Sequence, residues 1–490
     1  MEAPSNVIAQ RREKLDEIRN LGANPYPYRY SPTHTTSDIH RQFAAIQETP
    51  DESKPICIAG RIMTKRDHGK SSFANVQDSE GLIQIYVRQN VIGDDRYDIY
   101  KMLDVGDIVG VEGVVFRTRT GELTVLANAL ELLSKSLRPL PEKWHGLQDK
   151  ETRYRQRYAD LIVNREVKEV FSKRTLIVQA IRDYLNGIDF IEVETPVLQP
   201  IYGGANARPF ITHHNTLDQT LYLRIANELY LKRLIVGGFD RVYEFSKDFR
   251  NEGMDRDHNP EFTMLELYQA YADYEDIMCL TERLIAHTAK EVVGSTEITF
   301  QGEEISLEPP WRRLTMIESI GVETGIDVES LCDGSLQDAA LDAKVDLDGV
   351  ESRGGTIAAI FDTLVEPKLL QPTFICDYPI EVSPFAKKKR GDERFVERFE
   401  YFMVGMEMGN AFSELNDPID QRERFIEQGK KLEAGDEEAF MVDEDYLRAL
   451  EYGMPPTGGL GFGIDRLTML LTDQRSIRDV IFFPQMRPED

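Results

Sequence analysis

The hydrophobic pattern predicts that the chain begins with a helix. Over residues 6–21 the apolar side chains between Val7 and Leu21 fall near one stripe among charged residues, which is typical of an amphipathic helix. Gly22 and the prolines that follow it end this pattern. We expect residues 22–54 to form a connector rich in proline and tyrosine, with one short helix.

The next segment, residues 55–135, is a series of short β-rich runs separated by glycines. One helical stretch, at 95–103, interrupts the series. Five short strands with one helix suit a small Greek-key barrel of the OB type, whose exposed face commonly binds single-stranded oligonucleotides. An all-β module without that function would show the same rhythm. The predicted strands span 56–62, 72–77, 82–87, 108–115 and 123–132.

After a proline-containing linker, the remainder of the chain mixes helices with strands. The pattern predicts long helices at 164–185 and 275–293 and a strand at 190–197 that Pro196 interrupts. The acidic, glycine-broken stretch at 322–353 suggests an inserted helical subdomain. We therefore predict an α+β chain with these parts: an N-terminal helix and connector at 1–54, an OB-type barrel at 55–135, a linker at 136–150, and a mixed domain at 151–490 with a helical insertion at about 275–353.

The charge of the chain is distributed unevenly. The 490 residues carry a net charge of −27, which argues against a protein that coats nucleic acid through bulk electrostatics. Residues 1–140 hold 18 Lys and Arg against 19 Asp and Glu, whereas the remaining 350 residues hold 40 against 66. The N-terminal part is therefore much less repulsive to a polyanion, and it includes a basic cluster at Arg61, Lys65, Arg66 and Lys70. A solvated surface would show the same cluster, so charge alone decides nothing.

Cysteine usage and hydropathy bear on location. The four cysteines lie far apart without a C-x-x-C pair, which argues against a disulfide framework and against a cysteine-rich zinc site. Neither a signal peptide nor an apolar stretch of membrane-spanning length is present in the sequence. We expect a cytoplasmic protein without a membrane partner.

The segment 239–274 carries the densest chemistry, and it predicts a strand, a polar loop and a second strand. Because side chains alternate along a strand, Phe262, Glu266 and Tyr268 share one face of the second strand. Arg250 and Glu252 likewise share a face of the preceding strand. As a surface ion pair these two would contribute little, but their setting suggests a site for a planar, anionic ligand such as a nucleotide.

Several motifs in this order resemble a known family. FRNE followed by HNPEF resembles the second signature motif of class II aminoacyl-tRNA synthetases, and the continuation TMLELYQAYADY is similar to the lysyl-tRNA synthetases in particular. The helix at 165–187 leading into DFIEVETPVL resembles the first motif, which forms a dimer interface in that family. GGLGFGIDRLTML at 458–470 resembles the third motif. Similar stretches at 208–234 and 399–425 extend the resemblance over almost the whole chain, the N-terminal barrel included.

This resemblance implies an ATP-dependent reaction. L-Lysine and ATP would form lysyl-adenylate, and the lysyl group would pass to the 3′ end of tRNA(Lys) for protein synthesis, in a homodimer. Arg250 would bridge the α-phosphate and the substrate carboxylate, because a guanidinium can serve oxygens of two groups. Arg466 would hold the γ-phosphate. Phe262 would stack on adenine, sandwiched against the second arginine, and Glu252, His258 and Asn259 would complete the nucleotide loop.

The resemblance also implies Mg²⁺ as the cofactor, with Glu400 and Glu407 as its ligands. Hard oxygen ligands suit an ion that also binds substrate phosphates. Seven residues apart, these carboxylates would face opposite sides of a flat strand. We therefore expect a twist or a bulge near Gly405.

A different set of residues is implied for the amino acid. A buried lysine ammonium needs carboxylates around it, and Glu266 and Tyr268 are the candidates for the ε-ammonium. By resemblance Glu228 faces the α-amino group. Each glutamate alone would indicate only a solvated surface carboxylate. The remaining pocket would be lined by Gly204, Asn410 and Glu414.

The OB-type barrel is implied to bind the tRNA anticodon, whose splayed bases stack on aromatic rings and are read along their edges. Phe73 is the candidate for stacking, with Gln84 and Glu122 reading uridines and Arg61 near the backbone. An ordinary barrel-core phenylalanine is the alternative for Phe73.

Two features depart from a simple match. Asp257 occupies a position where many bacterial relatives have an arginine, so no phosphate contact is assigned to it, and Arg256 is a possible substitute from the loop. The glycines at 459, 461 and 463 superficially suggest a dinucleotide loop, but the G-x-G-x-x-G spacing fails.

Three rival functions remain. The first is an enzyme of the same architecture that charges aspartate or asparagine, which would need cationic groups in place of Glu266. The second is a degenerate synthetase kept for RNA binding, which would be expected to lose Arg250, Arg466 or the pair Glu400 and Glu407. The third is a paralogue that lysylates a protein, which would be expected to lack the barrel.

Overall fold

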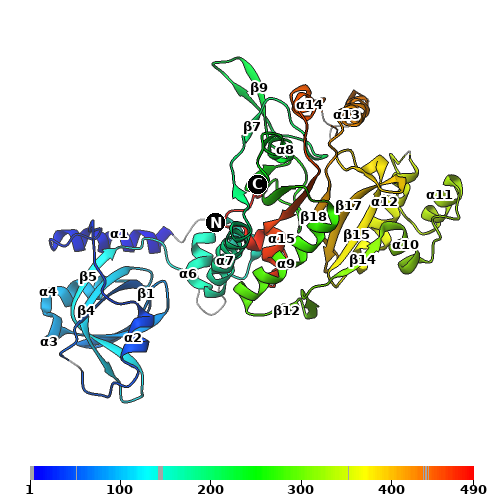
Figure 1. Ribbon diagram of the computed structural model, residues 1–490. Coiled ribbons are helices and arrows are strands. Elements are labelled where there is room, and N and C mark those ends of the chain that lie inside the picture. The colour runs from blue at the N-terminus through cyan, green and yellow to red at the C-terminus, as the bar shows by residue number, and fades with distance from the viewer. Residues whose placement is uncertain are drawn as a thin grey trace. The chain divides into compact units, whose positions relative to one another are not determined.

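The computed structural model describes residues 5–50, 52–141, 147–350, 352–433, 435, 439 and 441–489. The chain forms two compact units, residues 1–148 and residues 149–490 (Figure 1). Residues 142–146, within the predicted linker, lie outside the described residues. Among the helices in the described ranges, none combines the length and the apolar character needed to cross a bilayer.

The first unit is built around a closed barrel in which the strand order is β1-β2-β3-β5-β4. The predicted N-terminal helix is confirmed as α1 (Ser5–Asn20), and the short helix of the connector is α2 (Thr36–Gln42). All five predicted strands are confirmed, several of them longer than predicted. The elements are β1 (Ile56–His68), β2 (Ser71–Gln77), β3 (Leu82–Arg88), α3 (Gln89–Ile92), α4 (Asp94–Met102), β4 (Ile108–Arg117) and β5 (Leu123–Ser134).

Alternation along the barrel strands separates its core from its outer face. In β2, Ser72, Ala74 and Val76 are buried, whereas the residues between them are only partly buried. The interior is filled by β-branched and aliphatic side chains such as Ile85 and Val125, both fully buried. The outward-facing residues of β2 and β3 are therefore available for contacts outside the barrel.

The second unit is organised by a mixed sheet with the strand order β14-β15-β17-β18-β19-β11-β10-β6, and β16 pairs with β17. Its centre is antiparallel, and the outermost pairs, β14 with β15 and β6 with β10, are parallel. The sheet strands are β6 (Ile191–Glu192), β10 (Arg241–Phe249), β11 (Glu261–Ala270), β14 (Arg312–Thr315), β15 (Thr373–Pro379), β16 (Lys388–Lys389), β17 (Asp392–Met403), β18 (Met406–Ser413) and β19 (Thr457–Gly463).

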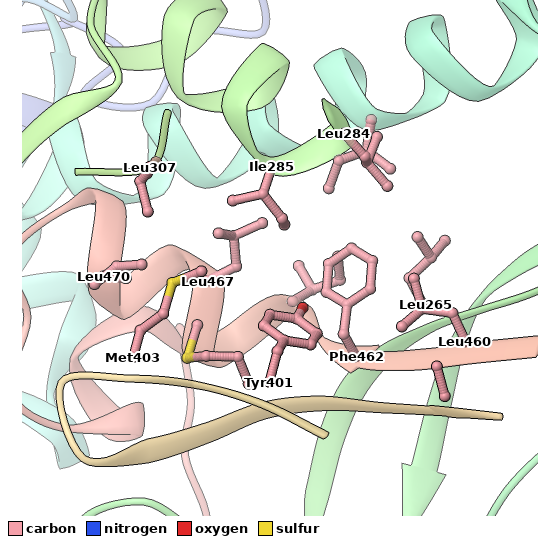
Figure 2. Packing of buried hydrophobic residues seen from close by; sticks show 14 of the residues in the cluster. Leu265, Leu284, Ile285, Leu307, Tyr401, Met403, Leu460, Phe462, Leu467 and Leu470 are labelled. Atoms are coloured by element: carbon pink, nitrogen blue, oxygen red, sulfur yellow. The ribbon is translucent and has the colours of Figure 1, made fainter. Parts of the chain in front are cut away.

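One face of this sheet is covered by helices. Helices α7 (Arg165–Gly187), α9 (Tyr274–Val293) and α15 (Ile464–Leu471) contribute apolar side chains to the largest core cluster. Figure 2 shows Leu284 and Ile285 of α9 above Leu265, Leu460 and Phe462 of the sheet. This packing fixes the strands from one side and leaves the polar residues of the opposite face for a site.

The remaining elements surround this core. They are α5 (Lys150–Arg155), α6 (Arg157–Val163), β7 (Leu198–Gln199), β8 (Ile211–His214), β9 (Gln219–Leu223), α8 (Glu228–Val236), β12 (Glu297–Phe300), β13 (Glu303–Ser306), α10 (Met316–Thr324), α11 (Asp333–Asp342), α12 (Arg353–Leu364), α13 (Pro418–Glu433), α14 (Glu444–Glu451) and α16 (Ile477–Val480).

Two predicted elements differ in the structure. The strand predicted at 190–197 is only two residues long in the sheet, and the N–H of Val193 makes one further hydrogen bond to the carbonyl of Tyr243 on β10. Pro196 has no N–H with which to extend this pairing. The predicted insertion at about 275–353 is not one helical body. Its first helix, α9, packs in the main core, and β14 joins the edge of the main sheet, so the helices outside that core are α10, α11 and α12.

Candidate active site

The face of the sheet that the helices leave open holds a cavity of about 410 Å³. The loop after β10, strands β11, β17, β18 and β19 and the first turns of α8 and α15 line it. Every residue that the sequence implicated in binding ATP, lysine or Mg²⁺ lines this cavity: Gly204, Glu228, Arg250, Glu252, His258, Asn259, Phe262, Glu266, Tyr268, Glu400, Glu407, Asn410, Glu414 and Arg466. Their individual roles stay predictions.

Strand β11 sets the two faces of the site. Leu265 and Leu267 are fully buried in the core beneath the sheet. Phe262, Glu266 and Tyr268 lie on the other face and line the cavity. The predicted alternation is thus what brings an aromatic ring, a carboxylate and a phenol together on one side.

Glu266 is a carboxylate without a cationic partner. It is 6% exposed, and it accepts a hydrogen bond from the hydroxyl of Tyr268 at 3.0 Å. Burial, with Asp248 and Glu228 nearby, raises the pKa of Glu266 well above its usual range. In contrast, the neighbouring Asp248 has Arg224, whose Nε lies 3.2 Å from its Oδ1. Within the described residues no Lys, Arg or His forms an ion pair with Glu266, so this end of the cavity suits a cationic ligand.

Glu228 and Glu414 meet at a buried lysine. Lys232 lies one helical turn after Glu228 on α8, and its Nζ is 2.5 Å from Glu228 Oε1. The same ammonium contacts Glu414 at the end of β18. Burial raises the pKa of Glu414 to about 8 despite the opposing effect of Lys232, with Glu228 adding to the shift. Glu228 and Glu414 line the cavity that also holds Glu266, and Lys232 is buried behind them.

The other end of the cavity holds two guanidinium groups. Arg250, directly after β10, places its Cζ 5.1 Å from the ring centroid of Phe262. Its Nε is buried and has no hydrogen-bond partner among the described residues. Arg466, in the first turn of α15, donates to the carbonyl of Glu407. In the structure Arg250 therefore lies over the ring that was predicted to stack adenine against the second arginine.

The loop between β10 and β11 is tied down at several points. His258 places Nε2 3.3 Å from Arg466 Nη2, and its Nδ1 lies 2.9 Å from Asp255 Oδ2. The side-chain amide of Asn259 is already hydrogen-bonded to backbone groups. Its Nδ2 donates to the carbonyl of Glu261, and its Oδ1 accepts from the N–H of Gln485. Direct contact between Asn259 and a nucleotide stays a prediction.

The rim of the same loop carries the residues that depart from the family pattern. Arg256 and Asp257 pair with each other at 3.2 Å on the surface. The carbonyl of Arg256 accepts hydrogen bonds from the N–H of Ile477 at 2.9 Å and the hydroxyl of Ser476 at 3.2 Å. Glu252 is exposed at this rim.

Glu400 and Glu407 lie on two strands of one hairpin. Glu400 is on β17 and Glu407 on β18, and the turn between them contains Val404 and Gly405 with φ of 52° and 69°. Glu400 pairs with Asn410, and Tyr401 with Gly409, but Phe402 pairs with Glu407. The extra residue on β18 is a β-bulge, which returns Glu407 to the cavity face. A bulge is therefore present, but its extra residue is Met408, three residues after the predicted position at Gly405.

The carboxylates of this hairpin fit a hard cation. Glu400 accepts hydrogen bonds from Arg398 and from the hydroxyl of Tyr378. Burial raises the pKa of Glu400 to about 7, partly opposed by Arg398, while Glu407 adds to the increase. No group of three or more Asp, Glu, His or Cys in the described residues is arranged to hold a metal alone. Two carboxylates match Mg²⁺, which keeps waters and takes substrate phosphate oxygens.

Known proteins resemble this chain over its full length. Residues 149–487 match the family of class II tRNA synthetases (D, K and N), and residues 56–133 match the OB-fold nucleic acid binding domain. The lysine–tRNA ligase of Pelotomaculum thermopropionicum is 58% identical, covering 99% of this chain and 96% of its own. That of Carboxydothermus hydrogenoformans is 56% identical over 99% of both chains. The lysine–tRNA ligase of Clostridium botulinum is 50% identical, over 100% and 97%.

The chain belongs to the lysine–tRNA ligase family of class II tRNA synthetases. The resemblance seen in the sequence motifs is therefore confirmed, as is the α+β architecture with an OB-fold unit. Activation of lysine and charging of tRNA are the activities that membership of this ligase family supports.

Two residues of this family member's site were missed in the sequence. Arg398 lies two residues before Glu400 on β17, so strand alternation places both side chains on the cavity face. Lys232 follows Glu228 at the i+4 position of a helix, where side chains meet. Both spacings were visible in the sequence, but neither residue belongs to a signature motif.

The OB-fold unit of this ligase-family chain presents aromatic rings on its outer face. Phe73 and Tyr86 are paired across β2 and β3 with ring centroids 4.3 Å apart, and Phe116 lies 6.4 Å from Tyr86. Phe73 is partly exposed and lies outside the barrel core cluster, which argues against the core alternative. Gln84 lies on the same face of β3 as Tyr86.

The polar residues predicted to contact tRNA on this unit differ in whether their side chains already form hydrogen bonds within the protein. Gln84 donates to Thr124 Oγ1 at 2.9 Å, and Glu122 is exposed in the turn before β5. Arg61 donates to the carbonyl of Gly106 at 2.7 Å. Lys65, part of the basic cluster, has a side chain only 10% exposed, and its ammonium donates to carbonyls at the end of α4. The cluster is therefore not one open cationic surface.

Proposed function

We propose that this chain activates L-lysine with ATP to lysyl-adenylate and transfers the lysyl group to the 3′ end of tRNA(Lys). The observation that carries the proposal is the arrangement of one cavity: Glu266, a buried carboxylate without a cationic partner among the described residues, at one end and two guanidiniums, Arg250 and Arg466, at the other. The third guanidinium of the lining, Arg398, is paired with Glu400. A substrate with an ammonium tail and a carboxylate head, placed beside a triphosphate, matches this charge pattern.

In this proposal the site works by positioning and by electrostatics. Arg250 holds the lysine carboxylate against the α-phosphate and stabilises the charge that develops there. Arg466 and His258 hold the far end of the triphosphate, and Phe262 supports adenine. No side-chain nucleophile takes part, because the substrate carboxylate itself attacks the α-phosphate and displaces pyrophosphate. The 3′-terminal hydroxyl of the tRNA then attacks the carbonyl of the adenylate and displaces AMP.

At the lysine end, Glu266 and Tyr268 receive the ε-ammonium, and Glu228 receives the α-ammonium. Gly204, Asn410 and Glu414 shape the rest of the pocket. A methyl group at Gly204 would lie 3.1 Å from Glu228 Cβ, and the positive φ of 91° there favours glycine. An aspartate or asparagine substrate, the nearest rival, would bring a carboxylate or amide against Glu266 without a compensating cation.

Mg²⁺ would be held by Glu400 and Glu407, and it would supply charge neutralisation to the phosphate oxygens when bound. The acidic surroundings support this assignment. Burial raises the pKa of Glu366 to about 7, with Asp362 as the next largest cause and Glu407 after it. An added cation offsets such crowding of carboxylates.

For assembly we propose a homodimer formed through the first-motif region. Leu176 on α7 is 52% exposed, Ile191 on β6 is 50% exposed and Leu198 on β7 is 49% exposed. An exposed apolar set of this kind is what a second copy would cover. A cytoplasmic location stays a prediction.

The OB-fold unit is proposed to bind the anticodon of tRNA(Lys). Phe73, with Tyr86 beside it, offers a stacking surface for unpaired bases. Gln84 and Glu122 would contact base edges, and Arg61 would lie near the nucleic acid backbone.

Exchange of labelled pyrophosphate into ATP, measured with each of the twenty amino acids, tests the function. We expect exchange to depend on L-lysine and charging to follow with tRNA(Lys) taken from total tRNA. Exchange driven by aspartate or asparagine would replace the substrate assignment. A protein that binds tRNA but exchanges with no amino acid would be the degenerate RNA-binding form, and lysylation of a protein without tRNA charging would indicate the third rival.

A further inference from the structure

Directly behind two carboxylates that line the cavity lies a cation that the proposed substrate contacts do not use. The side chain of Lys232 is 0% exposed, and those of Glu228 and Glu414, which it contacts, are 8% and 1% exposed. Three aromatic rings enclose the ammonium, those of Tyr268, Phe385 and Phe412, at 6.0, 5.3 and 5.2 Å from their centroids. A lysine held this deeply does not serve solubility, and its placement needs a reason in the site.

Counting formal charges at this end of the cavity gives that reason. With every group ionised, Glu228, Glu266 and Glu414 contribute three negative charges and Lys232 contributes one positive charge, while Arg398 and Glu400, which also line the cavity, pair with each other and cancel. The net charge of −2 balances the charge of +2 on the two ammonium groups of lysine. Without Lys232, the pocket would carry one buried carboxylate too many for its substrate.

The orientation of the Glu228 carboxylate also supports a role for Lys232 in the site. Its Oε1 is held by Lys232 at 2.5 Å. Its Oε2 lies on the side of Gly204, 3.8 Å from where a methyl group at that glycine would be, and Gly204 lines the cavity. Oε1 is thus held by Lys232, and Oε2 is available to a ligand.

We propose that Lys232 is a positioning residue for lysine recognition: it balances the charge of the pocket, favours the ionised form of Glu228 and holds that carboxylate with one oxygen turned toward the α-ammonium. This inference rests on the proposed function. Lys232 does not touch the substrate, so its effect passes through Glu228 and Glu414.

The groups that face this cluster determine its pH behaviour. Tyr446 and Tyr268 face Lys232 in addition to the two carboxylates, and Arg398 acts on Glu228. Two buried carboxylates with no cation between them share a proton. Removal of Lys232 therefore leaves Glu228 partly neutral, and lysine binding then requires a proton to be lost.

The test is steady-state pyrophosphate exchange with Lys232→Met, Glu414→Gln and the double variant, at several pH values. We expect Lys232→Met to raise the KM for lysine about tenfold or more while the KM for ATP changes little. In the pH profile of kcat/KM for lysine, the fall at acidic pH should begin at a higher pH in Lys232→Met than in the wild type. The double variant removes both charges in a similar volume, and we expect it to have a lower KM for lysine than either single variant.

Three results of this experiment would count against a proposal. If Lys232→Met keeps the lysine KM and pH profile of the wild type, or if the KM values for lysine and ATP rise equally, the proposal is overturned. If Lys232→Met does not fold, the double variant is compared with Glu414→Gln, and a lysine KM that is not lower overturns it. Failure of the wild type to exchange with lysine would instead reject the proposed function.

Discussion

At the scale of single residues, Glu266 is the side chain on which the choice of lysine depends. Glu266→Gln keeps the shape but removes the charge that meets the ε-ammonium. Losing a charged hydrogen bond in a buried site costs about 2–4 kcal/mol, so the KM for lysine should rise about 30- to 1,000-fold. Pyrophosphate exchange at varied lysine and varied ATP measures this, and the KM for ATP should stay nearly constant. An equal loss for both substrates would contradict the pocket.

The raised pKa of Glu400 makes the metal requirement dependent on pH. With a pKa of about 7, the carboxyl is mostly protonated at pH 6 and mostly ionised at pH 8, a change in ionised fraction of about tenfold. Since Mg²⁺ binds the ionised form, the Mg²⁺ concentration for half-maximal exchange should be higher at pH 6. Glu400→Gln serves as the control. Its amide cannot titrate and binds Mg²⁺ weakly, so the variant should need a high Mg²⁺ concentration at both pH values. Identical Mg²⁺ curves for the wild type at pH 6 and pH 8 would exclude this assignment.

At the scale of elements, strand β19 lines the cavity with three alternate glycines, Gly459, Gly461 and Gly463. A methyl group at Gly459 would lie 2.0 Å from Glu414 Oε1 and 2.6 Å from Tyr268 Cε1. A methyl group at Gly461 would meet Glu266 Cγ at 3.5 Å, an ordinary contact. The glycines therefore form the backbone wall of a pocket rather than a dinucleotide loop.

This difference between neighbouring glycines gives a matched pair of variants. Gly459→Ala forces Glu414 or Tyr268 to move, and overpacking of this kind costs about 1–3 kcal/mol. We expect a marked rise in the KM for lysine for Gly459→Ala and a much smaller one for Gly461→Ala, measured by the same exchange assay. Similar behaviour of the two variants would show that the wall does not limit the pocket.

The sequence predicted the elements that depend on local pattern, and it did not predict the features that depend on strand pairing or tertiary packing. Alternation and helical spacing gave the barrel strands, α7 and α9 nearly at their bounds, and motif similarity gave the residues that line the cavity. The position of the bulge before Asn410 was not given, because it follows from pairing between β17 and β18. The place of Arg250 over Phe262 also depends on tertiary packing.

At the scale of the whole molecule, the chemistry and the proposed RNA recognition are in different units. The second unit, residues 149–490, holds every residue of the cavity, whereas Phe73 lies in the first. Phe73→Ala should remove stacking worth about 1–3 kcal/mol and lower kcat/KM for tRNA charging by about 5- to 150-fold. Exchange without tRNA should be unchanged, and Phe73→Trp should retain charging. A loss of exchange in Phe73→Ala would argue against this division of labour.

The attachment of the β10–β11 loop has a practical consequence for work on this enzyme. Backbone groups at Ile477 and Gln485 hold Arg256 and Asn259 in place, and the carbonyl of Phe482 accepts a hydrogen bond from the buried Arg157. Residues 477–485 thus hold in place the loop that is proposed to bind the triphosphate. A truncation shortly before Ile477 would therefore release this loop and impair pyrophosphate exchange without removing any residue proposed to bind lysine.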